Sequence, residues 1–409
     1  MFIDSLLYDA TAEITKSLNQ LAININKKFN VVITKQGVGQ RFTKAAVKYI
    51  QALIGNQLSN QVNHSIDTGW FKLFKRVLIK DSTKFDVSEN LAKQLPGFGG
   101  SASKAGVSIQ YEFDIKSGEV SDLTITPANV PDNKDTSKTI GNVREGDLII
   151  RDLGYSKISC FNTMNNAGAY FISRLNVTIV VYEMIENRLV ELDFAKLYKT
   201  MTEGKIQRLE KQVLIGEKDK LPVRIIIELL PEEVVNKRLK KTNAHNKKKG
   251  QKTSDNYKIR ACFNMYITNI KEIILEAGVI VKIYKIRWQV ELIFKAWKSI
   301  FGIDNNNPMK YERLICLLNV RLLLILINWD LFMQKRLQLY METGKLLSIN
   351  KCFKTLQENS EELRHILTNN CKKLIKWLEE ISRLFESHHW LERRKNKTGL
   401  VEIMLLNIL

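Results

Sequence analysis

Four polar side chains in the last third of the chain have types and a spacing that make them candidates for chemistry at one site. Tyr284, Arg287, Glu291 and Lys298 occupy relative positions 0, 3, 7 and 14. At about 100° per residue, one continuous helix would carry all four within a stripe roughly 60° wide. The stripe would set a carboxylate among a phenol, a guanidinium and an ammonium. The alternative is a surface ion-pair ladder, because Arg287 and Glu291 are an i, i+4 pair worth only about a few tenths of a kcal/mol.

The elements that must position these side chains are visible in the hydrophobic pattern. We expect one long helix over about 271–301, whose other face is apolar and packs on a sheet. That face carries Ile286, Val290, Ile293 and Trp297. The segments 77–81 and 147–152 have the pattern of short apolar strands, and each ends in a carboxylate, Asp81 and Asp152.

The remaining pattern predicts an α/β protein with a mixed sheet of the ribonuclease-H type, because three hairpin-connected strands precede alternating helices and strands. Further strands are expected at 107–113, 121–126, 170–175, 177–182, 223–228 and 262–268, with helices at 135–142 and 156–167. The predicted domains are a helical DNA-binding module (1–70), the first part of the catalytic core (71–175), a β-rich insertion with a basic run (176–260), the closing strand and Glu helix of the core (261–305) and a helical C-terminal region (306–409).

The N-terminal region, 1–70, has the apolar spacing of helices over 10–21 and 42–58. Between them a polar turn with two glycines, 35–41, leads to Thr43, which could cap the second helix. A helix, a short turn and a second helix could form a DNA-binding module. An ordinary helical hairpin would have the same pattern.

The charge balance favours a polyanionic partner. Lys and Arg number 63 against 43 Asp and Glu, which gives a formal net charge of +20. Each phosphate that a Lys or Arg neutralises releases condensed counterions. The run 237–252 is densely basic and is either a solvated surface or a contact with the DNA backbone. Five widely spaced cysteines argue against a disulfide framework or a zinc ribbon, and the apolar stretch 314–331 is interrupted by polar residues, so we expect a core helix and no membrane span.

The order Tyr, two residues, Arg, three residues, Glu, six residues, Lys resembles the signature of the transposases of insertion sequence four and its relatives, which use an Asp-Asp-Glu triad. The core Arg287-Trp288-Gln289-Val290-Glu291, with Phe-Lys and Trp-Lys pairs after it, also resembles that family. The likeness covers about residues 30 to 305. It implies two earlier carboxylates at strand ends, where Asp81 and Asp152 stand.

The resemblance implies that Asp81, Asp152 and Glu291 are the catalytic residues and metal ligands. Mg²⁺, for which Mn²⁺ can substitute, suits such a set because it prefers oxygen ligands. Two ions about 3.5–4 Å apart would activate the attacking oxygen and stabilise the leaving one. Asp152 could instead cap the helix that follows it.

Three other carboxylates compete with Asp81 for the first position of the triad. We expect Asp114 and Asp122 on the solvent side of the hairpin and Asp86 beyond the end of its strand, so Asp81 is preferred.

The family also implies contacts with DNA. Tyr284, Arg287 and Lys298 would contact phosphates beside the scissile bond, with Arg able to grip a phosphate bidentately and Lys acting as a point charge. Trp288 would stack on an unpaired base. Because Trp288 lies off the stripe, packing in the core is an equal alternative.

The expected function is therefore cleavage of DNA at the ends of a mobile element and joining of those ends to a target. The expected partners are double-stranded DNA, comprising terminal inverted repeats and target DNA, and a second copy of the chain, with the C-terminal region a candidate for the dimer contact. We expect a cytoplasmic, nucleoid-associated protein. The rivals are a catalytically silent DNA-binding relative that represses transposition and a basic RNA-binding or structural protein.

Overall fold

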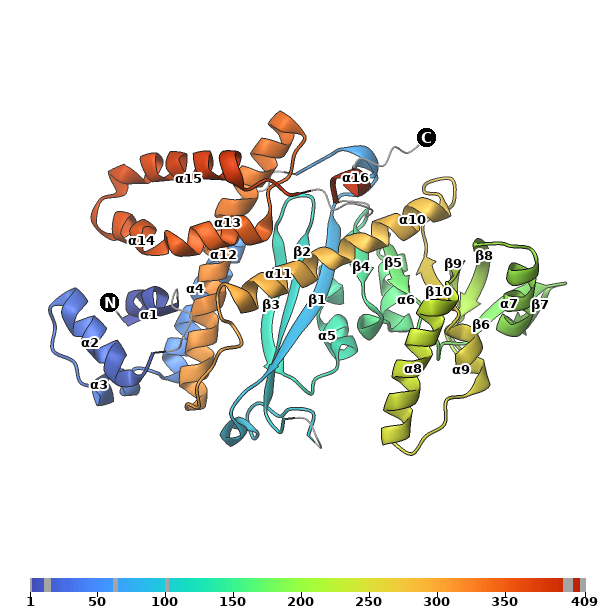
Figure 1. The fold of residues 1–409 in the computed structure, drawn as a ribbon, viewed down its shortest axis with the longest axis horizontal. Coiled ribbons are helices and arrows are strands. Elements are labelled where there is room, and N and C mark those ends of the chain that lie inside the picture. The colour runs from blue at the N-terminus through green and yellow to red at the C-terminus, as the bar shows by residue number, and fades with distance from the viewer. Residues whose placement is uncertain (1, 11–15, 62–64, 100–102, 393–399, 405–409) are drawn as a thin grey trace. The chain divides into compact units, whose positions relative to one another are not determined.

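The computed structural model describes residues 2–10, 16–61, 65–99, 103–392 and 400–404 (Figure 1). Within them the chain forms two compact units. Unit 1 comprises the described residues of Met1–Phe71, Lys80–Val130 and Trp288–Leu405, and unit 2 comprises Lys72–Ile79 and Pro131–Arg287. Each unit is therefore assembled from segments that are far apart in the sequence.

Ten strands are hydrogen-bonded in the order β3-β2-β1-β4-β5-β10-β9-β8-β6-β7. Their bounds are β1 (Val77–Asp86), β2 (Gly106–Asp114), β3 (Val120–Pro127), β4 (Leu148–Arg151), β5 (Tyr170–Arg174), β6 (Val181–Ile185), β7 (Arg188–Glu191), β8 (Arg208–Ile215), β9 (Leu221–Leu229) and β10 (Phe263–Thr268). β4 and β5 are parallel, whereas β2–β3 and β5–β10 are antiparallel. The predicted mixed α/β class is confirmed.

The N-terminal part of unit 1 is helical, with α1 (Phe2–Ala10), α2 (Leu18–Phe29), α3 (Lys35–Gln40) and α4 (Lys44–Ser59). The predicted cap is confirmed, because the Thr43 hydroxyl accepts a hydrogen bond from the backbone of Ala46. The expected turn at 35–41 is wrong: Thr34 caps a short helix there by accepting from Gly37. Of the helix expected over 10–21, residues 11–15 lie outside the described part of the chain.

The rest of unit 1 adds the β1–β3 strands and helices from the C-terminal third. These are α11 (Trp288–Ser299), α12 (Tyr311–Thr343), α13 (Ile349–Glu358), α14 (Ser360–Asn369), α15 (Leu374–His388) and α16 (Leu400–Met404), with 3-10 turns at Gly69–Leu73, Glu89–Leu91 and Cys371–Lys373. The sequence also has a basic patch at Arg393-Arg394-Lys395-Asn396-Lys397, which lies outside the described residues.

The long helix α12 is a core element. By length and composition it could cross a membrane, but 83% of its most apolar window is buried. Helices α1, α4 and α13 pack along it, and Gln57 of α4 donates a hydrogen bond to Asp330 of α12 at 2.5 Å. The prediction of a core helix at 314–331 agrees with this packing.

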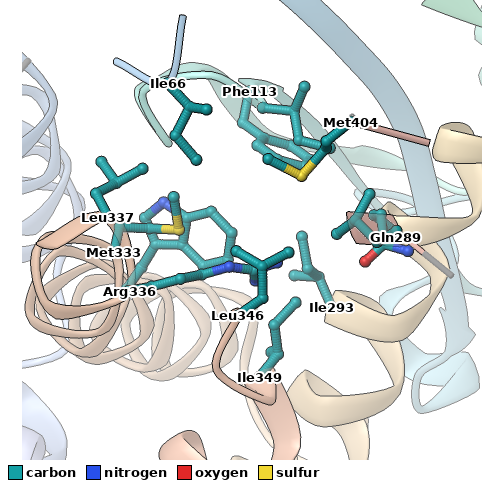
Figure 2. A pocket seen from close by; sticks show the side chains of 13 residues that line it. Ile66, Phe113, Gln289, Ile293, Met333, Arg336, Leu337, Leu346, Ile349 and Met404 are labelled. Carbon is teal, nitrogen blue, oxygen red and sulfur yellow. The ribbon is translucent and has the colours of Figure 1, made fainter. Parts of the chain in front are cut away.

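A small cavity lies where α11 meets α12, β2 and the end of the described chain (Figure 2). Ile293, Phe113, Met333, Arg336 and Met404 are among its lining residues. Its volume is about 20 Å³, close to the roughly 10–15 Å³ that one water needs. It is therefore a packing void and no substrate pocket.

Unit 2 carries β4 to β10 and the start of β1. Its helices are α5 (Asp132–Thr139), α6 (Ile158–Asn166), α7 (Phe194–Glu203), α8 (Glu232–Lys248), α9 (Asp255–Arg260) and α10 (Ala277–Tyr284), with 3-10 turns at Ile140–Asn142, Leu153–Tyr155 and Lys285–Arg287. One apolar core joins β4, β5, β9 and β10 to α6 and α7. The expected strand at 177–182 begins only at Val181, because the chain turns at Asn176, whose carbonyl accepts from the backbone of Ile179.

Candidate active site

Asp152 stands where β4 ends in unit 2. All four residues of β4 are buried, so the strand end is held firmly by the sheet. Asp152 takes the N-cap position of the 3-10 turn Leu153–Tyr155, but its side chain makes no capping hydrogen bond. The side chain is 41% exposed. Asp152 therefore does not act as a helix cap, and its carboxylate faces accessible space.

Two residues of the Tyr-Arg-Glu-Lys motif contact this carboxylate. The Tyr284 hydroxyl donates a hydrogen bond to Asp152 Oδ1 at 3.2 Å, across 132 positions of sequence. The Nε of Arg287 lies 3.8 Å from the same oxygen. Both contacts are made to the same oxygen, one by a neutral donor and one by a cation. The first half of the motif thus meets the second predicted carboxylate.

The surroundings of Tyr284 keep its hydroxyl protonated. Burial raises the pKa of Tyr284 well above its usual value, and the negative charge of Asp152 raises it further. Arg287 and Arg174 lower this pKa, but the first two effects dominate. Tyr284 is therefore a hydrogen-bond donor to Asp152 at any physiological pH.

Arg174 belongs to this cluster and was missed in the sequence. It is the last residue of β5, and it donates a hydrogen bond to the side chain of Asn264 at 3.0 Å. The parallel register pairs Arg151 with Ser173, so Asp152 and Arg174 leave the two strands at the same edge. The available signal was topological, since neighbouring parallel strands end together. Because β4 and β5 are parallel neighbours, the charged residue that ends β5, Arg174, was a candidate for the same site as Asp152.

Asp81 lies inside β1 and not at a strand end, which corrects the prediction. The strand continues to Asp86 because Ser82-Thr83-Lys84-Phe85 keep a strand-forming pattern, with Thr83 buried. Asp81 is half-buried, and its Oδ1 accepts from the backbone of Ser82 at 2.8 Å. The competing Asp86 is the exposed last residue of the strand.

The other two competitors are buried, so their expected place on the solvent side of the hairpin is wrong. Asp114 is 3% exposed and accepts from the Ser117 hydroxyl at 2.8 Å. Asp122 is 8% exposed and pairs with the Lys80 ammonium at 2.6 Å. Both carboxylates serve the packing of unit 1, which leaves Asp81 and Asp86 as candidates.

Glu291 and Lys298 lie on α11, the second half of the motif. Seven residues apart, they share a helix face. The expected docking face is confirmed: Val290, Ile293 and Trp297 are buried, and the Trp297 ring packs edge-on against Tyr111 of β2 at 4.9 Å. Lys298 donates a hydrogen bond to the Lys84 carbonyl of β1 at 3.3 Å. This half of the motif is thus fixed to the strand that carries Asp81.

The single helix expected over 271–301 is wrong. The chain forms α10, a 3-10 turn at Lys285–Arg287 and then α11, so the motif is divided between two helices. A 3-10 turn changes the rotation per residue, so the angular spacing of one continuous helix does not apply across the motif. The division between the compact units falls at the same place, between Arg287 and Trp288.

Trp288 is 48% exposed, so the alternative that it packs in the core is wrong. The Lys295 ammonium lies over its ring at 5.2 Å. An exposed indole beside a cation offers an apolar face next to positive charge, which suits a flat base attached to a phosphate backbone.

The three predicted metal ligands fit Mg²⁺ in their chemistry, since all are carboxylates. Asp81 and Glu291 belong to unit 1 and Asp152 belongs to unit 2. In the described part of the chain, no three His, Cys, Asp or Glu side chains are gathered into a metal site. The assignment of these three carboxylates as metal ligands therefore depends on the motif and on the contacts that each residue makes within its own unit.

Comparison with known proteins shows that the chain is similar to transposases over most of its length. The family model for the transposase DDE domain matches residues 72–327. The transposase for insertion sequence element IS231B of Bacillus thuringiensis subsp. berliner is 29% identical over 403 residues, covering 95% of this chain and 84% of its own length. The transposase for IS1151 of Clostridium perfringens is 29% identical over 332 residues, covering 77% and 69%.

Among solved structures, a piggyBac transposase synaptic complex with hairpin DNA matches 97% of this chain and 77% of its own, with a TM-score of 0.45 and 10% identity. The family model matches well over half of the chain, and it includes all the carboxylates discussed above. The chain belongs to the family of transposases with a DDE domain.

Proposed function

We propose that this chain is the transposase of an insertion sequence, which cleaves phosphodiester bonds at the ends of the element and joins them to target DNA by metal-assisted transesterification. The observation that carries the proposal is the contact of Tyr284 and Arg287 with Asp152. It links two motifs that are distant in the sequence, and a shared site explains why they meet. Membership of the DDE family supports the same chemistry.

The catalytic core is proposed to be ribonuclease-H-like. The support is the order of the first five strands, β3-β2-β1-β4-β5, in which a hairpin of antiparallel strands is followed by a parallel pair joined through α6. The strands β6 to β9 follow this set and precede α11, as an insertion between the second carboxylate and the third would.

Asp81, Asp152 and Glu291 are proposed to hold Mg²⁺, as two ions, with Mn²⁺ able to substitute. When bound, such ions lower the pKa of an attacking water or hydroxyl and stabilise the leaving oxygen. Tyr284 and Arg287 hold the Asp152 carboxylate in one orientation. They act on this ligand as positioning residues.

The proposed reaction has two stages at one site. Water attacks the scissile phosphorus, a new P–O bond forms, the P–O3′ bond breaks, and the 3′ oxygen leaves as a hydroxyl after gaining a proton. That hydroxyl then attacks a target phosphodiester, forming one P–O bond as another breaks. Neither stage needs a covalent bond to the protein.

The DNA contacts are proposed to come from both halves of the motif. Arg287 is proposed to grip a phosphate beside the scissile bond, since the fork of N–H donors on a guanidinium suits a phosphate. Lys298 would act as a point charge on the backbone, and Trp288 would stack on an unpaired base. Tyr284 is 8% exposed and bound to Asp152, so its contact with a phosphate would be made beside the carboxylate it holds.

A homodimer in the synaptic complex is proposed, formed through the C-terminal helices, in a cytoplasmic, nucleoid-associated protein that takes terminal inverted repeats and target DNA. The support is a groove of about 590 Å³ between α12 and α15. Met341, which lines it, and Ile375 of α15 are 77% and 71% exposed. Basic residues lie just before and at the start of α15 (Lys372, Lys373, Lys376), and its later part holds three glutamates with one arginine among them (Glu379, Glu380, Arg383, Glu386). Antiparallel α15 helices of two copies would set the basic start of one beside the glutamates of the other.

Ile375→Glu tests this dimer contact by sedimentation of the complex on DNA ends. We expect the mass of a complex with two copies for the wild type and of one copy for the variant. An unchanged mass would place the contact elsewhere.

The test of the main proposal is strand cleavage of a labelled duplex that carries the element's own end, with Mg²⁺, Mn²⁺ or a chelator. We compare the wild type with Glu291→Gln, and with Glu272→Gln as a matched control because Glu272 is exposed. We expect metal-dependent nicking that Glu291→Gln loses and Glu272→Gln keeps, with DNA binding retained in both. Specific binding without cleavage in any metal would instead indicate a silent DNA-binding relative.

A further inference from the structure

Helix α8 of unit 2 is polar almost all round. Val235 is its only buried residue among those that the structure describes, and the helix runs beside β10 and α9 (Figure 1). A helix of this kind needs either many internal ion pairs or a partner for its polar face. Apart from two glutamates in its first turn, α8 has no acidic residue, so internal ion pairs do not account for it.

The lysines of α8 lie on one face. At about 100° per residue, the set falls within an arc of about 120°. Its members are Lys237, Lys240, Lys241, Lys247 and Lys248, and we call them the lysine stripe. Every one is exposed. The stripe lies opposite the face that carries Val235, Leu239, Thr242 and Asn246, so it points away from the protein.

The inner face of α8 is anchored by specific hydrogen bonds. Arg238 donates to the carbonyls of Ala261 and Phe263 at 3.0 and 2.9 Å and to the Asn264 side chain at 3.0 Å. Burial lowers the pKa of this guanidinium, in keeping with a role in packing. Thr242 meets the Tyr257 hydroxyl at 3.0 Å. These hydrogen bonds anchor the inner face of α8. They use Arg238, the one arginine of the helix, whereas the lysines point outward.

The helix dipole explains only part of the stripe. Cations in the last turn of a helix are favoured by the partial negative charge there, which covers Lys247 and Lys248. Lys237, Lys240 and Lys241 lie one to two turns earlier. Within the described residues, the ion pairs of unit 2 join other side chains, and no carboxylate lies within 4 Å of the stripe.

We propose that the lysine stripe of α8 binds the phosphate backbone of double-stranded DNA without regard to base sequence. This rests on the proposed function of the chain as a DNA-acting enzyme. From Lys237 to Lys248 the stripe is about 16 Å long at 1.5 Å per residue. That length spans several phosphates of one strand, at about 3.4 Å per strand phosphate. Flexible lysines serve as point charges and carry no base preference.

The anchor also ties the stripe to the candidate active site within unit 2. Asn264 accepts hydrogen bonds from Arg238 of α8 and from Arg174 of β5. Arg174 in turn lies close enough to Tyr284 to lower its pKa. A duplex on α8 would therefore be held at a fixed place relative to Asp152, so that the backbone contact also sets where the DNA lies on unit 2.

The experiment is titration of a labelled duplex, unrelated in sequence to the element, with the full chain at several salt concentrations. The test variant is Lys237→Gln, Lys241→Gln and Lys248→Gln together. The control variant, Lys196→Gln, Lys199→Gln and Lys218→Gln, removes the same charge from exposed lysines of unit 2 with acidic neighbours, such as Glu203 beside Lys199. A third variant changes the three stripe lysines to arginine.

We expect the stripe variant to bind roughly 10- to 100-fold more weakly at 0.1 M salt and to lose about 2 to 3 from the slope of log K against log salt, since each phosphate contact contributes about 0.9. The control variant and the arginine variant should keep the slope of the wild type. The stripe variant should lose affinity by the same factor on a duplex that carries the element's own end.

An unchanged slope in the stripe variant would overturn the inference, as would an equal loss in both glutamine variants, or a loss seen on duplex RNA but not on DNA. Metal-dependent cleavage by the wild type would still support the proposed function in those cases. Failure of the wild type to bind or cleave any DNA would overturn the proposed function itself.

Discussion

The two halves of the Tyr-Arg-Glu-Lys motif make different contacts. Tyr284 and Arg287 close unit 2 and contact Asp152, which follows β4. Glu291 and Lys298 belong to unit 1, where Lys298 is bonded to β1, the strand of Asp81. Each half is thus fixed to a different carboxylate-bearing strand.

The two halves also differ in the elements that carry them. Tyr284 ends α10 and Arg287 ends the 3-10 turn, whereas Glu291 and Lys298 lie on α11. The first half has the character of a support, because Tyr284 is buried and bound to Asp152. The second half supplies a carboxylate of its own, on a helix whose other face is packed against β2.

The largest expected effect concerns β1, the strand to which the second half of the motif is bonded. It distinguishes Asp81 from Asp86 as the first carboxylate of the triad. Asp81→Asn should lower the cleavage rate by about three orders of magnitude, because a lost metal ligand removes several kcal/mol of stabilisation at about 1.4 kcal/mol per tenfold. Asp86→Asn, on the same strand, should cleave like the wild type. Single-turnover cleavage on a labelled end measures both. The reverse result would move the first carboxylate to the strand end.

A smaller effect is expected for the first half. Tyr284→Phe removes the donor to Asp152 and should lower the rate by about 10- to 100-fold, the usual cost of losing a group that orients a metal ligand. It should also raise the Mg²⁺ concentration needed for half-maximal rate. Tyr266→Phe is the control, because this ring packs at 5.2 Å from Tyr284. If both variants behave like the wild type, the first half serves packing alone.

Lys298→Gln should have a modest effect on binding. We expect DNA affinity to fall by several-fold and the salt slope to drop by about 1, as for one phosphate contact. Lys295→Gln, which removes the exposed ammonium over Trp288, should change the slope less. Anisotropy titrations at several salt concentrations compare the two. An unchanged slope for Lys298→Gln would limit this residue to holding β1.

The smallest expected effect is that of pH on the ratio of the wild-type cleavage rate to the rate of Tyr284→Phe, which should stay constant. Because burial and Asp152 raise the pKa of Tyr284 above its usual value, its hydroxyl stays protonated, and so keeps donating, as pH rises toward about 10, where a free tyrosine ionises. The ratio of wild-type to Tyr284→Phe rates should therefore not change between pH 7 and about pH 9.5. A ratio that falls over this range would show ionisation of Tyr284 and contradict the assigned environment.

Much of the sheet could be predicted, because its strands have strong local patterns. The strands 107–113 and 121–126 and the end of β4 at Asp152 appear nearly where the alternation of apolar residues places them. The length of β1 was missed, since the polar residues Asp81, Ser82 and Lys84 break the apolar run there, although Thr83 and Phe85 are residue types that favour strands. Burial of Asp122 was also missed, because its partner Lys80 is polar too and lies 42 residues away.

The contact between the motif and Asp152 could be expected from the sequence, but its geometry could not. The motif spacing singled out Tyr284 and Arg287, and the end of an apolar strand singled out Asp152, yet no local signal indicated the 3-10 turn at Lys285–Arg287, which has neither Pro nor Gly. Arg174 and the exposure of Trp288 depend on strand register and on packing across the fold. Such features depend on tertiary contacts that a local pattern does not contain.

The burial of α12 has a consequence for shortened copies of this gene. Its most apolar window has a mean hydropathy of 1.9, and α1 and α4, which pack along it, are made earlier in synthesis. A product that begins downstream of α4 would expose the apolar face of α12 that α1 and α4 cover. Loss of the first 60 residues would thus leave an exposed apolar patch on the remainder, which favours aggregation.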